Sequence, residues 1–263
     1  MTALDVPQPA SPAIPLSGSS VAGQRLQLLL GVATLPAPGK VNEDFYTVVA
    51  PTDADGSKRG VILAVADGVS ANGSGGAAAQ ATLRGLAADY YATPTHWSVG
   101  QSLDRLLRAA NEWLWAQNGR RPDHDGVVTA VSLLVLRDHR YYLAHVGDTR
   151  VYRLRGRSFQ QLTTDHTWQR HDMRHVLRRA VGLDSYLVVD FADGDVENGD
   201  AFLLATDGVW EVLGDSTMTD ILRGELRPDG AARTLVEAAQ RHQAAYMGRN
   251  DATAVVVCVE PVS

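Results

Sequence analysis

The sequence predicts an α+β fold in which helix pairs cover antiparallel sheets from outside. Residues 61–66 and 201–205 are apolar, have the length of buried strands, and soon reach an Asp-Gly pair. Short apolar segments separated by polar turns between residues 127 and 162 are typical of an antiparallel meander. Helical periodicity occurs in neighbouring pairs of segments and not after every strand, which favours α+β over a strictly alternating fold.

The individual elements follow from periodicity and turn residues. Alanine-rich sequence predicts a helix over 76–91, and apolar residues at helical spacing predict another over 99–114 with Ser98 as N-cap. Two further helices are expected over 216–222 and 230–247. The expected strands are 26–32, 45–49, 61–66, 127–136, 141–146, 151–154, 159–162, 187–191, 201–205 and 254–259.

Composition limits the class of protein. The 263 residues suffice for a substantial core, and the formal net charge of −6 argues against nucleic acid or an anionic membrane as main partner. The single cysteine, Cys258, lies in an apolar segment as an inert thiol and excludes an internal disulfide. No apolar run approaches the roughly 20 residues that span a bilayer, and no signal peptide is recognisable, so we expect a cytoplasmic protein.

The chain divides into a tail and one domain. Residues 1–23 are rich in Pro, Ala, Ser and Gly without periodicity, which predicts a flexible tail. Residues 24–263 carry all the periodic segments and form the expected domain.

Acidic residues stand beside several predicted strands. Asp67 and Asp207 follow two apolar strands, the pair Glu43 and Asp44 precedes a third, and Asp251 precedes the last. Each acid alone is better explained as a turn or capping residue than as a metal ligand. Together they indicate a site for Mg²⁺ or Mn²⁺, which prefer oxygen ligands. If Asp67 bridges two ions roughly 3.5–4 Å apart, an activated water can hydrolyse a phosphoester without a protein nucleophile.

Five motifs occur in a specific order. They are Val41-Asn42-Glu43-Asp44, Ala66-Asp67-Gly68, Gly147-Asp148-Thr149-Arg150, Ala205-Thr206-Asp207-Gly208 and Asn250-Asp251-Ala252-Thr253. In this order they resemble the metal-dependent serine/threonine protein phosphatases of the 2C type, over about residues 25–260. Residues 147–154 and 113–117 are most similar to the phosphatase halves of bacterial phosphatase-kinase fusions.

The resemblance implies a catalytic domain folded as a four-layer αββα sandwich, with a binuclear Mn²⁺ or Mg²⁺ centre at one edge between two antiparallel sheets. Asp67 is implied to bridge both ions, and Asp207 and Asp251 to complete the protein ligands of the first. Water activated by the two metals would attack phosphorus in line.

The remaining metal ligands are implied in the same way. The Gly68 carbonyl and the pair Glu43 and Asp44, directly or through water, would serve the second ion. Asp148 matches an aspartate that shares a third ion with Asp207.

The sequence departs from the family beside the first motif. Many members carry an arginine four residues before the glutamate, to hold the substrate phosphate, and here that position is Gly39. Our hypothesis is that Lys40 supplies the positive charge, although a lysine is a point donor and cannot make the fork of an arginine. The alternative is a solvated loop lysine.

Two further departures concern loops. Residues 69–76 form a longer, glycine-rich connection, without the histidine acid of animal relatives, that either cradles phosphate or simply leads into a helix. Residues 164–180 replace the longer flap of bacterial relatives with a short basic segment. This segment either docks an acidic substrate or is a solvated helix face, and its histidines are interpreted as surface residues. Its charged side chains are His166, Arg170, His171, Arg174, His175, Arg178 and Arg179.

The resemblance therefore implies a bacterial Mn²⁺- or Mg²⁺-dependent phosphatase acting on phosphoserine and phosphothreonine in proteins. Asp67, Asp207, Asp44 and Lys40 are its expected catalytic residues. The expected partners are phosphorylated proteins and a cognate kinase in the same or another chain, and a monomer is expected. Two alternatives stay open, namely a partner-binding module that has lost catalysis and a hydrolase of small phosphoesters.

Overall fold

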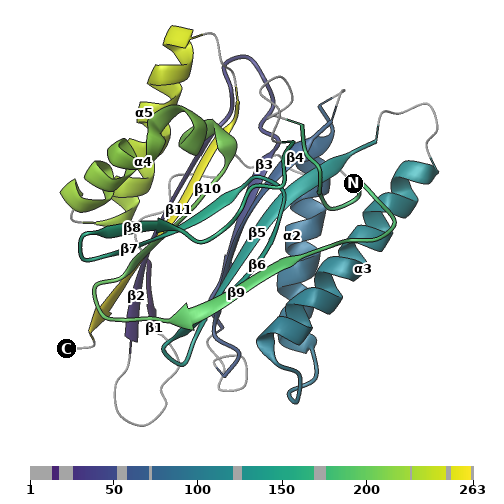
Figure 1. The fold of residues 1–263 in the computed structure, drawn as a ribbon, viewed down its shortest axis with the longest axis horizontal. Helices are drawn as coiled ribbons and strands as arrows, with labels where there is room; N and C mark the ends of the chain where they lie inside the picture. Colours follow the sequence, from purple (N-terminus) through teal and green to yellow (C-terminus); the bar gives the residue numbers. More distant parts are fainter. Residues whose placement is uncertain are drawn as a thin grey trace, which may run out of the picture.

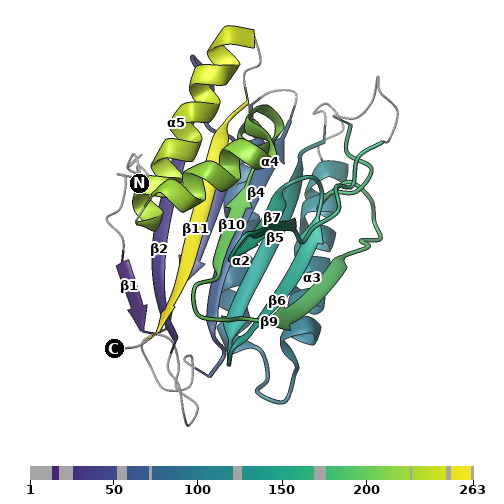
Figure 2. The ribbon, with the colours of Figure 1, turned by 60° about the vertical axis from the view of Figure 1, so that its left-hand side comes forward.

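The fold is a sandwich of two antiparallel sheets covered on each outer face by a pair of helices. The computed structural model describes residues 14–17, 26–51, 58–70, 73–120, 126–168, 176–225, 227–246 and 250–261. Figures 1 and 2 show α2 and α3 on one side of the strands and α4 and α5 on the other. The predicted α+β class and the four-layer αββα order are confirmed.

One sheet has the strand order β1-β2-β11-β10-β7-β8, and the other has the order β3-β4-β5-β6-β9. All neighbouring strands are antiparallel. The strands are β1 Ile14–Ser17, β2 Leu26–Leu35, β3 Asp44–Val49, β4 Val61–Val69, β5 Val128–Arg137, β6 Arg140–Val146, β7 Arg150–Arg155, β8 Ser158–Gln161, β9 Asp190–Asp195, β10 Ala201–Ala205 and β11 Ala252–Pro261. The helices are α2 Gly75–Ala92, α3 Val99–Gly119, α4 Asp207–Gly224 and α5 Pro228–Tyr246.

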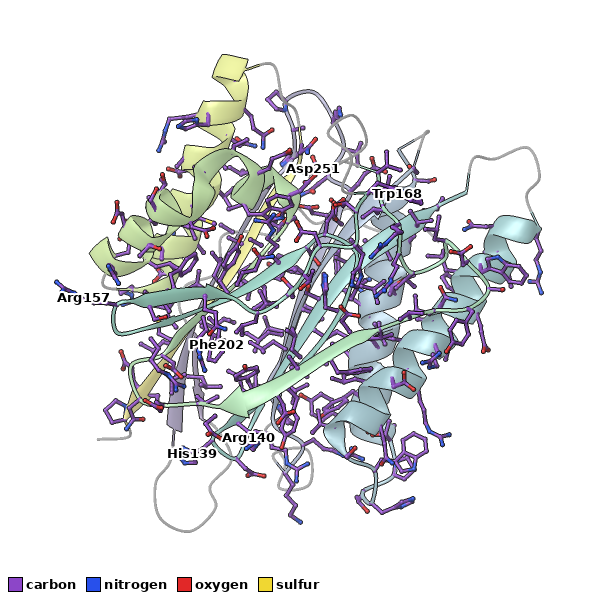
Figure 3. All side chains as sticks on the ribbon, viewed as in Figure 1. His139, Arg140, Arg157, Trp168, Phe202 and Asp251 are labelled. Atoms are coloured by element: carbon purple, nitrogen blue, oxygen red, sulfur yellow. The ribbon has the colours of Figure 1, made fainter. Side chains whose placement is uncertain are left out.

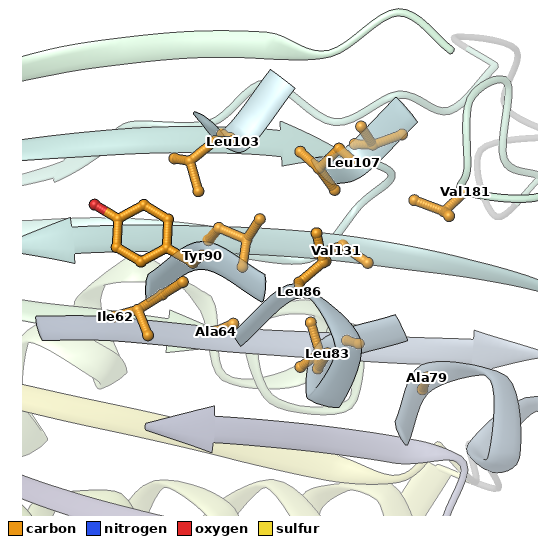
Figure 4. Packing of buried hydrophobic residues seen from close by; sticks show 14 of the residues in the cluster. Ile62, Ala64, Ala79, Leu83, Leu86, Tyr90, Leu103, Leu107, Val131 and Val181 are labelled. Atoms are coloured by element: carbon orange, nitrogen blue, oxygen red, sulfur yellow. The ribbon is translucent and has the colours of Figure 1, made fainter. Parts of the chain in front are cut away.

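Apolar side chains fill all three interfaces between the four layers. Between the sheets, the rings of Tyr141 and Phe202 pack with centroids 5.6 Å apart. Under α2 and α3, Leu83 and Leu103 are fully buried in the cluster of Figure 4. Central strands such as β4 are therefore buried on both faces, which explains why residues 61–66 are apolar without alternation.

Helix α3 begins where the sequence predicts. Ser98 has an extended backbone, and its hydroxyl accepts a hydrogen bond from the backbone N–H of Gln101. The Gln101 side chain accepts in return from the backbone N–H of Ser98, which completes a capping box.

Helix α4 begins nine residues earlier than predicted, at Asp207 and not at residue 216. The sequence prediction placed Asp207-Gly208 after a strand and outside any helix, but Thr206 is the N-cap and Asp207 is the first helical residue. Gly214 interrupts the helical geometry with φ +67°, so the predicted helix is only the part that follows this kink. The predicted α5 ends one residue beyond the observed one, and residue 247 lies outside the described residues.

The last strand of the second sheet is shifted from the predicted 187–191 to Asp190–Asp195. The reason is that β9 is an edge strand of mostly polar sequence, which apolar patterning misses. Arg140 on the neighbouring strand pairs with Asp193 and Asp195.

Four residues of the predicted flexible tail are ordered in the first sheet. Ile14–Ser17 forms β1, which pairs with β2 from Ile14 opposite Leu30 to Ser17 opposite Gln27. This differs from the prediction, because an edge strand needs backbone pairing and no apolar periodicity. The rest of residues 1–23 lies outside the described residues. None of the described helices is long and apolar enough to cross a membrane.

Candidate metal centre

The acidic motifs gather at one end of the sandwich. Strands β3, β7 and β11 begin at this end, whereas β4, β6 and β10 finish there. Figure 3 shows Asp251 at this end and His139 and Arg140 at the opposite end. The chain also crosses here between the sheets three times, after β2, after β6 and after β8. The antiparallel topology therefore brings together residues more than 200 positions apart in sequence.

Asp67 lies inside β4 and not at its tip, because the strand continues to Val69. Its backbone is in register with Asp44 on one side and Ala130 on the other. The Thr129 hydroxyl donates to the Asp67 carbonyl oxygen at 2.9 Å. The position of Asp67 is thus fixed by two neighbouring strands.

Asp44 joins the two sheets through buried hydrogen bonds. Its Oδ2 atom accepts from the hydroxyls of Thr206 and Thr253, each at 2.7 Å. Asp44 begins a strand of one sheet, whereas the two threonines lie at the strand ends of the other. The threonines stand in the recognised motifs without a predicted role, because their pairing with Asp44 arises only in the folded structure.

The acids at this end repel one another. Burial raises the pKa of Asp44 to about 8, and the charges of Asp207 and Asp251 add to the rise, while the two threonine hydroxyls oppose it. Burial and the Asp44 carboxylate hold the pKa of Asp67 well above its usual range. Burial and the Asp67 carboxylate do the same for the pKa of Asp207. A divalent cation would relieve this repulsion, and the oxygen-only donor set fits Mg²⁺ or Mn²⁺.

We expect the metal-free protein to lose stability as pH rises from 6.5 to 8. In this window the folded state binds more protons than the unfolded state, because the pKa of Asp44 is about 8 when folded and near 3.8 when unfolded, so the free energy of unfolding falls with pH. Burial lowers the pKa of His145 from 6.5 to about 4. Its titration makes the free energy of unfolding rise with pH, but only below pH 6.5 and therefore outside this window. The measurement is Tm with excess chelator at both pH values.

Asp44→Asn is the matched variant, since its amide oxygen can still accept both threonine hydroxyls. It should show a smaller loss of Tm between pH 6.5 and 8 than the wild type. An equal loss in both proteins would contradict the assignment.

Glu43, Gly68 and Gly75 form a narrow cradle beside Asp67. The Glu43 Oε1 atom accepts from the Ser70 hydroxyl at 2.8 Å and from the Gly75 backbone N–H at 2.6 Å. The Gly68 N–H donates to the Glu43 carbonyl oxygen at 3.1 Å. A Cβ on Gly68 would lie 2.2 Å from the Gly75 carbonyl oxygen, so the Asp-Gly pair is required here by close backbone approach.

Asp148 occupies the crossing turn between β6 and β7. It is nearly buried, and burial together with the Asp165 carboxylate raises its pKa to about 6. The Trp210 indole donates to the Asp148 carbonyl oxygen at 3.0 Å. Arg150 stacks on the Trp210 ring and makes a bidentate ion pair with Asp165, at 2.9 and 2.7 Å. The Asp148 turn is therefore held from the side of α4.

His166 is buried, which corrects its interpretation as a surface residue. Its Nδ1 atom accepts from the Gly147 N–H at 3.1 Å, and its backbone N–H donates to the Gly147 carbonyl oxygen at 2.7 Å. Its Nε2 atom lies 3.0 Å from Asp190, which also pairs with Arg179. The basic segment thus supports the Asp148 turn. Arg170, His171, Arg174 and His175 lie outside the described residues.

Asp207 and Asp251 have different surroundings. Asp207 is the first residue of α4, and the Asn250 side-chain nitrogen donates to its Oδ2 atom at 2.8 Å. Asp251 accepts two backbone hydrogen bonds at 2.6 Å, from Ala37 to Oδ1 and from Glu43 to Oδ2. Within the described part of the chain, no three His, Cys, Asp or Glu side chains are already grouped closely enough to hold an ion.

Gly39 and Lys40 lie in the crossing loop after β2. Gly39 has φ +77°, a conformation that favours glycine, and the Lys40 N–H closes the turn onto the Ala37 carbonyl oxygen at 3.0 Å. The Lys40 side chain is exposed. The loop is attached to the acidic end through Asp251, which places Lys40 near the site.

Cys258 is half-buried in β11 and not in the core proper. Burial raises its pKa to about 11, which agrees with an unreactive thiol.

Comparison with known proteins identifies the family. The model of the protein phosphatase 2C family matches residues 37–249, and the chain belongs to this family. The recognition made from the five motifs is confirmed, as is the predicted enzyme class, a protein serine/threonine phosphatase.

Relatives and solved structures agree with this assignment. The protein phosphatase PhpP of Streptococcus pneumoniae is 24% identical over 192 residues, covering 66% of this chain and 78% of that protein. PppA, a regulatory component of the type VI secretion system in Pseudomonas aeruginosa, has a TM-score of 0.75 at 26% identity, over 88% of this chain and 97% of that one. The catalytic domain of the serine/threonine phosphatase PstP, solved with two manganese ions, has a TM-score of 0.73 at 27% identity, over 89% and 99%.

Proposed function

We propose that this protein hydrolyses phosphoserine and phosphothreonine in protein substrates, with Mn²⁺ or Mg²⁺ as cofactor, in bacterial signalling. The observation that carries the proposal is the pair Asp67 and Asp207, two acids of raised pKa at one end of a protein phosphatase 2C fold. The two manganese ions of the PstP structure support the choice of cofactor.

The residues that would hold the ions surround Asp67. Asp67 and Asp207 would hold one ion, and Asp67 with the Gly68 carbonyl and Glu43 would hold the other. When bound, such ions lower the pKa of a water that attacks phosphorus and provide positive charge for the phosphoryl oxygens. The carboxylates must be ionised to hold them, so metal affinity rises with pH.

Asp44 and Asp148 have supporting roles in this proposal. Asp44 lies directly opposite Asp67 and adds negative charge to the second-ion side, while its threonine partners keep both sheets in register at the site. Asp148, on the crossing turn, adds a carboxylate toward Asp207, whose pKa it helps to raise. Asp148 and Asp207 would together hold a third ion.

We expect Lys40→Ala to raise KM for a phosphopeptide by about tenfold with a smaller change in kcat, because a charge-assisted contact to phosphate contributes about 1.5 kcal/mol or more. The chain offers a matched control, since its only other lysine is Lys58 at the opposite end of the sheets. Lys58→Ala should match the wild type. Equal KM values for all three proteins would leave Lys40 a solvated loop residue.

The substrate class is tested with a panel of phosphopeptides against free phosphoesters, each with and without Mn²⁺. The proposal predicts Mn²⁺-dependent release from phosphothreonine and phosphoserine peptides at a kcat/KM well above that for small phosphoesters. A preference for small phosphoesters would assign a different hydrolase. Absence of release by folded, metal-bound protein would favour a binding module.

We also propose that a serine/threonine kinase, in the same or another chain, phosphorylates the substrates, and that the domain acts as a cytoplasmic monomer. Two bacterial relatives that are named serine/threonine phosphatases, Stp of Listeria welshimeri and PstP of Mycobacterium tuberculosis, support a role opposite such a kinase. Deleting the gene segment for this domain should raise phosphate occupancy on the shared substrates. Sedimentation of the purified protein tests the monomer.

A further inference from the structure

The two residues that precede β11 meet different parts of the site. Asn250 faces Asp207, with its side-chain nitrogen 2.8 Å from Oδ2. Asp251 faces the crossing loop, where its oxygens accept from the backbone N–H groups of Ala37 and Glu43, both at 2.6 Å. The carboxylate predicted as a metal ligand is therefore already engaged, and an amide lies beside Asp207.

The hydrogen bonds that Asp251 accepts hold the crossing loop in place. The Asp251 carboxylate accepts two short, charge-assisted hydrogen bonds, which tie both ends of residues 37–43 to the start of β11. This segment carries the chain from one sheet to the other and ends at Glu43. Turning Asp251 toward an ion would leave two backbone N–H groups without these partners, at the cost of unsatisfied donors.

Asn250 is held in place independently. Its backbone N–H donates to the Gln243 Oε1 atom at 2.7 Å, and the Gln243 side-chain nitrogen donates to the Gly208 carbonyl oxygen at 2.9 Å. Gln243 is 3% exposed, so this bridge from α5 is nearly buried. The bridge fixes Asn250 relative to the start of α4, where Asp207 lies.

We propose that Asn250, and not Asp251, supplies the side-chain oxygen that faces an ion beside Asp207. Asp251 is then a positioning residue that fixes the crossing loop. In the metal-free protein the Asn250 side-chain nitrogen donates to the Asp207 carboxylate. A rotation of the amide by about 180° would direct its oxygen to a cation bound beside Asp207. This inference rests on the metal centre proposed above.

With Asn250 as a ligand, the metal centre carries one negative charge fewer than a centre with an aspartate at this position. Affinity for hard cations depends on the number of charged ligands, so the protein should bind Mn²⁺ less tightly than its Asn250→Asp variant. The Asn250→Asp change also places a like charge beside Asp207 in the metal-free protein, which should lower its Tm.

The test is calorimetric titration of Mn²⁺ into metal-free protein at fixed pH, with Tm recorded before and after metal. Asn250→Asp should lower the Mn²⁺ Kd by about tenfold or more, and Asn250→Ala should raise it by about tenfold. Asp251→Asn should change the Kd less than either, while lowering Tm by several degrees with and without metal. If Asp251→Asn does not fold, the two Asn250 variants decide.

An unchanged Kd in Asn250→Asp would overturn the proposal, as would a larger loss of affinity in Asp251→Asn than in Asn250→Ala. Binding of Mn²⁺ by neither wild type nor Asn250→Asp would also overturn it. Phosphate release at saturating Mn²⁺ is measured separately. If release is absent while the Kd values change as expected, the proposed function fails and the assignment of Asn250 stands.

Discussion

Asp67→Asn should lower kcat/KM for a phosphothreonine peptide by a factor on the order of 10²–10³ or more, the range for losing one preorganised electrostatic group. The effect is large because Asp67 is proposed to hold both ions, so one substitution removes a ligand from each. The same change should raise Tm in the presence of chelator, since it removes one of several buried acids that repel one another.

Opposite effects on activity and metal-free stability distinguish a ligand from a residue needed for folding. Asp89→Asn on the exposed face of α2 is the matched control and should alter neither quantity. A lower Tm in chelator for Asp67→Asn would contradict the account, because it would mean that the carboxylate stabilises the fold by itself.

Gly208→Ala should destabilise the protein by about 3 kcal/mol, the upper part of the usual range for overpacking, and lower Tm by about 6–12 °C. A Cβ at this position would lie 2.0 Å from the Asp251 carbonyl oxygen and 3.2 Å from the Gln243 side-chain nitrogen. The neighbouring atoms belong to the backbone before β11 and to a buried side chain, so they cannot move away without shifting the start of α4. The measurements are Tm and Mn²⁺ affinity, and both should fall.

The control for Gly208→Ala is a glycine with open space around it. Gly85 lies inside α2, and apart from its chain neighbours and the backbone of its own helix no heavy atom lies within 4 Å of a Cβ built there. Gly85→Ala should therefore stabilise the protein by about 0.5–1 kcal/mol, the gain expected in a helix interior. If both variants changed Tm in the same direction, close approach at Gly208 would not explain its effect.

Apolar strands and amphipathic helices were predictable because their burial leaves a periodic signal. The failures occur where that signal is weak. Strand β9 has polar side chains at a sheet edge, and β1 depends on pairing with β2. Helix α4 begins at Asp207-Gly208, a dipeptide that elsewhere forms turns, and only the approach of the Asp251 backbone explains the glycine.

The acidic motifs were predictable as a group, and the structure brings them to one end of the sandwich. Which side chain faces which could not be read from the motifs, because Asn250 and Asp251 are adjacent and only their hydrogen bonds separate them. The same holds for His166, since a basic segment gives no indication that one of its histidines is buried against Gly147. The metal roles of the acids stay predictions until metal binding is measured.

The most direct test of the central claim is phosphate release from a phosphothreonine peptide, with and without Mn²⁺, by the wild type and by Asp207→Asn. Asp220→Asn, on an exposed position of the same helix, is the control. The account predicts Mn²⁺-dependent release by the wild type and by Asp220→Asn, and almost none by Asp207→Asn. Release that is independent of metal, or that survives in Asp207→Asn, would contradict a metal centre built on Asp207.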